Sequence, residues 1–89
     1  MRKFWIKVEN ETEWDLSQRI LFALGYQWGG SGFELIYYQY NRHICVWSDG
    51  DMTHGKNYEL WYSGAGNIIY TFKEFLDYVE ENDIRHGKF

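Results

Sequence analysis

The sequence predicts an α+β domain with a mainly antiparallel sheet of four or five strands and two helices packed on one face of it. Three observations support this class: runs with a period of two, two stretches with helical spacing that begin at capping signals, and glycine-rich turns. The 89 residues have room for one core. No proline-rich linker or repeat divides them, so we expect a single domain over residues 1–89.

The first third of the chain predicts a strand followed by a helix. Residues 3–8 alternate between two faces, as a strand does. Asn10 lies three residues before Glu13, which is a capping signal, and helical spacing follows over residues 11–24. Gly25 suits the left-handed position that ends a helix.

The rest of the chain predicts four more strands and a second helix. The strands are expected at residues 33–40, 43–48, 58–62 and 67–70, with a tight hairpin turn at residues 41–42. Thr71 and Glu74 repeat the capping spacing, so a helix is predicted over residues 72–82, with Phe75 toward the core. Residues 83–89 are expected to form a frayed tail.

Composition excludes several classes of function. A single cysteine, Cys45, excludes an intramolecular disulfide and a cysteine-rich zinc site, and it fits a reducing cytosol. The net charge of -4 argues against binding to duplex nucleic acid, which needs clustered Lys and Arg. No apolar run is long enough to span a membrane. We therefore expect a cytoplasmic protein without a cofactor.

Surplus aromatic residues predict a contact surface. Trp14, Gln18 and Phe22 are spaced by four residues on the first predicted helix. They lie opposite an aliphatic stripe formed by Leu16, Ile20 and Leu24. Because a helix cannot bury both sides against one sheet, we expect the aromatic side to be exposed, together with rings on the second sheet face. The candidate partner-binding residues are Trp14, Gln18, Phe22, Tyr38 and Trp61. Loops that cover this face are the alternative.

A second interpretation is a nucleotide site. Trp28, Trp47 or Trp61 could stack on a base, as aromatic side chains do with nucleic-acid bases. Arg42, Lys56 or the glycine-rich backbone of residues 29–32 could then hold a phosphate.

Catalytic and metal-binding patterns are incomplete. His43 and Cys45 share a strand face and His54 follows, but three or four ligands are usual for zinc and no fourth is marked. Ser48, His54 and Asp51 contain the groups of a hydrolase, yet no recurrent catalytic signature surrounds them. We therefore expect neither a metal nor an enzyme, with a small hydrolase as the third hypothesis.

Four segments, Ile6–Val8, Leu21–Trp28, Trp47–Gly50 and Tyr70–Leu76, resemble small accessory proteins of tailed bacteriophages. The resemblance implies a protein of the host cytoplasm, in a class where non-enzymatic inhibitors of host defence are frequent. Our leading hypothesis is a stoichiometric inhibitor of a host protein, and the acidic charge favours a basic partner. The alternatives are a protein that sequesters a nucleotide signal and a surface that pairs with a second copy of the chain.

Overall fold

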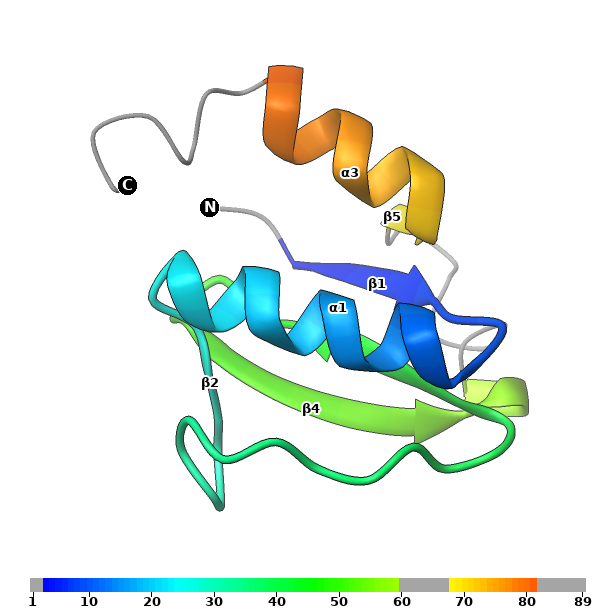
Figure 1. The fold of residues 1–89 in the computed structure, drawn as a ribbon, viewed down its shortest axis with the longest axis horizontal. Coiled ribbons are helices and arrows are strands. Elements are labelled where there is room, and N and C mark those ends of the chain that lie inside the picture. The colour runs from blue at the N-terminus through cyan, green and yellow to red at the C-terminus, as the bar shows by residue number, and fades with distance from the viewer. Residues whose placement is uncertain (1–2, 60–67, 82–89) are drawn as a thin grey trace.

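The computed structural model describes residues 3–59 and 68–81 of the chain. These residues form five strands, two longer helices and a short helical segment at residues 57–59 (Figure 1). In chain order the strands and the two longer helices are β1 (Phe4–Lys7), α1 (Glu11–Ala23), β2 (Gln27–Trp28), β3 (Arg42–Val46), β4 (Asp51–Lys56), β5 (Ile68–Thr71) and α3 (Phe72–Glu81). The α+β class is confirmed.

The strands form one sheet in the order β2-β4-β3-β1-β5. The three central strands are antiparallel, with Ile6 opposite Ile44 and Ile44 opposite His54. Each outer strand is parallel to its neighbour, since β2 pairs with β4 and β5 pairs with β1. The sheet is thus mixed, rather than mainly antiparallel throughout.

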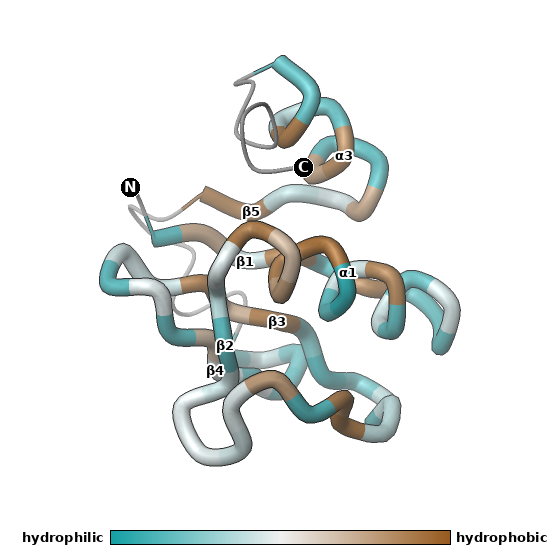
Figure 2. The backbone as a smooth tube through the Cα atoms, turned by 60° about the vertical axis from the view of Figure 1, so that its left-hand side comes forward, coloured by the Kyte–Doolittle hydropathy of each residue, from teal (hydrophilic) through white to brown (hydrophobic). Residues whose placement is uncertain are grey.

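Both helices pack on the same face of the sheet, as the sequence predicts. Alternate residues of β1 and β3 point to this face, and they form one core cluster with Trp14 and Leu21 of α1 and with Phe75 and Val79 of α3. Figure 2 shows hydrophobic stretches on β3, β5 and the C-terminal part of α1, with hydrophilic stretches on the outer side of α3. The predicted core position of Phe75 is confirmed by its complete burial.

Capping signals in the sequence set the helix ends. Asn10 accepts the backbone N–H of Glu13 with its side chain at 2.9 Å. Thr71 and Glu74 exchange two side-chain-to-backbone hydrogen bonds, of 2.9 and 3.1 Å, which is a complete capping box. Gly25 takes the left-handed conformation, with φ +99°, directly after Leu24, the C-cap residue of α1.

The predicted strand at residues 33–40 is wrong. A tight turn does form before Arg42, whose N–H donates to the carbonyl of Gln39 at 3.1 Å, but it does not join two paired strands and is therefore not the predicted hairpin. Residues 34–39 are extended but are not part of the sheet. The hairpin instead joins β3 to β4 through residues 47–50, where the N–H of Trp47 donates to the carbonyl of Asp51 at 2.9 Å. Tyr58 and Glu59, predicted as strand, are helical, and the rest of that predicted strand lies outside the described residues, as does the predicted tail.

Candidate functional site

The segment of residues 33–40, named the strap here, connects β2 to β3. In Figure 1 it runs as an extended chain along the free side of β4. β2 covers only the first part of that side, because its two residues pair with Asp51 and Met52. A pocket of about 380 Å³, lined by Ile36 of the strap and His54 of β4, lies between the two segments. The strap is therefore not paired with β4 as a neighbouring strand, and other contacts must hold its backbone.

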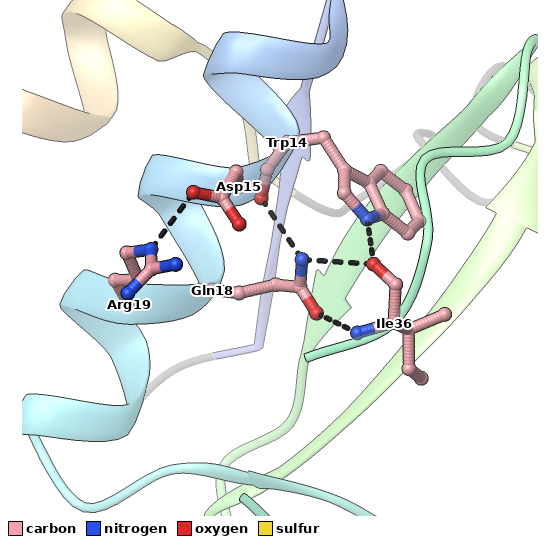
Figure 3. A network of polar contacts seen from close by, with 5 residues as sticks. All are labelled: Trp14, Asp15, Gln18, Arg19 and Ile36. Carbon is pink, nitrogen blue, oxygen red and sulfur yellow. Dashed lines mark hydrogen bonds and ion pairs between the residues drawn. The ribbon is translucent and has the colours of Figure 1, made fainter. Parts of the chain in front are cut away.

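A buried glutamine fixes the strap to α1. The side-chain oxygen of Gln18 accepts the N–H of Ile36 at 2.7 Å, and its amide nitrogen donates to the carbonyl of Ile36 at 3.1 Å (Figure 3). The indole N–H of Trp14 donates to the same carbonyl at 2.8 Å. Both backbone groups of Ile36 are thus satisfied by side chains of the helix.

The amide of Gln18 has further partners inside the protein. Its oxygen also accepts the indole N–H of Trp28 at 3.0 Å, and its nitrogen lies 3.4 Å from the carbonyl of Trp14. Gln18 has no exposed surface. A buried amide without partners is costly, whereas a fully bonded one specifies a single arrangement. The network therefore couples α1, β2 and the strap.

Aromatic rings surround this network. The rings of Trp14 and Trp28 are stacked with centroids 6.1 Å apart, and His54 contacts both edge-on at 5.9 and 5.7 Å. The guanidinium of Arg42 lies 3.0 Å from Nδ1 of His54. Burial is the main cause that lowers the pKa of His54, and the charge of Arg42 lowers it further, against an opposing effect of Glu59. These surroundings favour a neutral imidazole.

The strap shows large apolar side chains to solvent. Its side chains alternate, so that Ile36 and Tyr38 are half-buried while Leu35 and Tyr37 face outward, with 43% and 91% of their surfaces exposed. Phe33 is 59% exposed, and Leu16 of α1 is 42% exposed. We call Leu16, Phe33, Leu35 and Tyr37 the strap surface.

A groove lies between the strap and the first two turns of α1. It has a volume of about 650 Å³, and its lining includes Leu16, Leu35 and Tyr37 from the strap surface together with Glu11 and Asp15 from the helix. Asp15 also accepts a hydrogen bond from Arg19 at 2.8 Å, which is visible in Figure 3. The groove thus combines apolar walls with carboxylates.

The expectation that Trp14 and Gln18 are exposed is wrong. They belong to the buried side of α1 together with Ser17 and Leu21, and Leu16 is on the exposed side. The physical reason is that this side of α1 packs on the sheet, where Trp14 and Leu21 join the core cluster, while the backbone of the strap provides the hydrogen bonds that a buried Gln18 needs. Phe22 is half-buried against Phe33, with ring centroids 5.7 Å apart.

The remaining predicted contact residues are Tyr38 and Trp61. Tyr38 is half-buried and contacts Trp14 edge-on at 5.8 Å. Trp61 lies outside the described residues.

The residues proposed for a nucleotide site come together only in part. Trp28 and the backbone of residues 29–31 line the pocket of about 380 Å³, but Trp47, Arg42 and Lys56 are not among the residues that line it. Trp28 is buried at the Met52 end of β4, whereas Arg42 is opposite Lys56 at the other end. Trp47 follows β3, and its ring lies 4.1 Å from the ammonium of Lys3.

The residues considered for metal binding and hydrolysis are also divided between the two sheet faces. Cys45 points to one face and His54 to the other, since the partner of His54 in the register is Ile44. Asp51 and His54 likewise project from opposite faces. In the part of the chain that is described, no three His, Cys, Asp or Glu residues are grouped as a metal site.

The sequence interpretation missed Leu16, Leu35 and Tyr37 as surface residues. The alternation within residues 33–40 was the available signal, because it separates Leu35 and Tyr37 from Ile36 and Tyr38. The sequence contains a weaker signal for the buried position of Gln18. Positions 14, 17, 18 and 21 have the spacing of one helix face, but two of the four are polar.

Comparison with known proteins found no matching family model, no matching curated protein and no matching solved structure. Among residues 3–59 and 68–81, no helix has the length and apolar character needed to cross a membrane.

Proposed function

We propose that this protein is a non-enzymatic binding protein whose strap surface contacts a basic partner protein in a stoichiometric complex. The observation that carries the proposal is the exposure of Phe33, Leu35 and Tyr37 on a segment with a fixed backbone. Apolar surface gains about 25 cal/mol for each Å² removed from water, so these side chains favour association.

The buried network supports this role by holding the strap in place. A loop that must become ordered on binding loses part of the interaction energy to conformational entropy. Here Gln18 and Trp14 hold the backbone at Ile36 before any partner arrives. Tyr37 then resembles the rigid aromatic anchors that are enriched at protein interfaces.

Electrostatics favour a basic partner. The chain has a net charge of -4, and Glu11, Asp15 and Glu34 lie on or beside the strap surface. Complementary charge speeds association and selects the partner. The resemblance to phage accessory proteins makes inhibition of a host protein the biological role that we propose for this contact.

The test is quantitative capture from a bacterial lysate with three immobilised proteins: wild type, Tyr37→Ala and Tyr58→Ala. Tyr58 is the matched control, since it is 59% exposed but does not line the groove. We expect a basic protein that wild type and Tyr58→Ala retain and that Tyr37→Ala loses, with one-to-one stoichiometry in sedimentation of the purified pair. Equal capture by all three proteins would contradict the proposal.

A further inference from the structure

The groove beside the strap has a shape and a charge that identify the chemistry of its occupant. Its volume of about 650 Å³ lies within the range of small-ligand sites, roughly 300–1,000 Å³. Leu16 comes from α1, whereas Leu35 and Tyr37 come from the strap. The occupant therefore needs an apolar or flat part that can lie between these side chains.

The polar part of the groove is acidic. Glu11 and Asp15 are four residues apart, so they lie on the same side of α1, and no Lys or Arg is among the residues that line the groove. Arg19 pairs with Asp15, but 58% of the Arg19 side chain remains exposed, so solvent weakens that ion pair. The groove thus carries negative charge that the lining residues do not balance.

We infer that this groove holds an arginine side chain of the partner, an inference that rests on the proposed function. Arginine combines a methylene stem, which can pack on Leu16 and Leu35, with a planar guanidinium that stacks on tyrosine. The same guanidinium donates in a fork that matches a carboxylate such as Glu11. The compact ammonium of lysine can neither stack nor fork in this way.

Two other occupants fit less well. A second copy of this chain would bring another acidic protein, with its own net charge of -4, against Glu11 and Asp15. A phosphate group would meet the same carboxylates without a cation among the lining residues.

The inference can be tested without the partner. N-acetyl-arginine-methylamide is titrated into the ¹⁵N-labelled protein and followed by NMR, with the neutral isostere N-acetyl-citrulline-methylamide as the control ligand. We expect saturable shifts at the amides of Leu16, Leu35 and Tyr37 that weaken with added salt, and no comparable shifts with citrulline. Absent shifts, or equal shifts with citrulline, would overturn the inference.

A pair of variants tests whether Glu11 is the carboxylate that binds the guanidinium. Glu11→Gln should weaken binding of the arginine probe by at least about five-fold, because it removes an ionic partner of the guanidinium. Glu81→Gln, at the exposed end of α3, changes the net charge by the same amount and should leave the affinity unchanged. Equal effects of the two substitutions would overturn the inference.

Failure of this inference and failure of the proposed function give different results. If the arginine probe does not bind the groove while Tyr37→Ala still loses the captured partner, the arginine assignment is wrong and the strap surface remains the contact. If Tyr37→Ala retains the partner, the proposed function itself is wrong.

Discussion

The side-chain amide of Gln18 pairs with the backbone of Ile36 as a neighbouring strand would. Its oxygen accepts the N–H at 2.7 Å and its nitrogen donates to the carbonyl at 3.1 Å. A helix side chain thereby takes the place of a sheet edge. This relationship explains why the strap can be extended and ordered without being part of the sheet.

Substitution of Gln18 by Leu should destabilise the fold by about 2–4 kcal/mol. The change leaves the backbone N–H of Ile36 and the indole N–H of Trp28 without their acceptor, and each unsatisfied buried group costs about 1–3 kcal/mol. Gln39→Leu is the matched control, because Gln39 is an exposed strap residue. Urea denaturation of both variants measures the difference, and equal stabilities would show that the network contributes nothing.

Trp14 and Leu16 should differ sharply, although they are two residues apart on one helix. Trp14 is 1% exposed and Leu16 is 42% exposed. Trp14→Ala should cost about 3–5 kcal/mol of unfolding free energy. Leu16→Ala should change it by less than about 0.5 kcal/mol, because substitutions on the surface usually have small effects. Thermal or urea unfolding of the two variants measures both effects. A larger loss of stability in Leu16→Ala than in Trp14→Ala would mean that α1 turns its other side toward the core.

Substitution of Gly55 in β4 probes its close contact with the side chain of Trp5 in β1, and substitution of Gly30 is the control. A Cβ atom added at Gly55 would lie 2.7 Å from the indole of Trp5, whereas one added at Gly30 meets nothing within 4 Å. We expect Gly55→Ala to destabilise by about 1–3 kcal/mol through overpacking. Gly30→Ala should be neutral or slightly stabilising, by up to about 1 kcal/mol, because alanine restricts the unfolded chain. Equal melting temperatures would contradict the packing of Trp5.

The stability of the protein should depend on the protonation of His54. Burial and Arg42 lower its folded-state pKa below the ordinary value of 6.5, so the unfolded chain binds the proton more readily. This contribution is therefore complete above pH 6.5 and is lost as the pH falls toward the lowered folded-state pKa. Urea unfolding of wild type and His54→Gln between pH 7.5 and about 5 measures it. The variant should lose less stability on acidification. Identical pH profiles of the wild type and the variant would contradict a lowered pKa of His54 in the folded protein.

Local signals in the sequence predicted much of the fold. The caps at Asn10 and Thr71 and the terminating Gly25 place both helices within about a residue of their observed ends, because capping depends on nearby groups. The alternation around Phe4 and Ile6 also predicted β1 and placed these two residues on the same face, which is the face of the main core cluster. These features need no information about distant residues.

The strap could not be predicted in the same way. Residues 33–40 have the composition and alternation of a strand, but their pairing depends on Gln18, which lies 18 residues before Ile36. A glutamine between Trp14 and Leu21 suggests an exposed helix face, unless a distant backbone is known to satisfy it. The candidate site was therefore placed on the wrong side of α1, because its position depends on this one long-range contact.

Amide hydrogen exchange by NMR tests the central claim, that the strap is held at Ile36 by Gln18. The account predicts that the amide of Ile36 is protected about a hundred-fold more than those of Leu35 and Tyr37, since only Ile36 donates into the buried network. Gln18→Leu should abolish the difference in the folded protein. Equal and rapid exchange of all three amides in the wild type would contradict it, because the strap surface would then not be formed before binding.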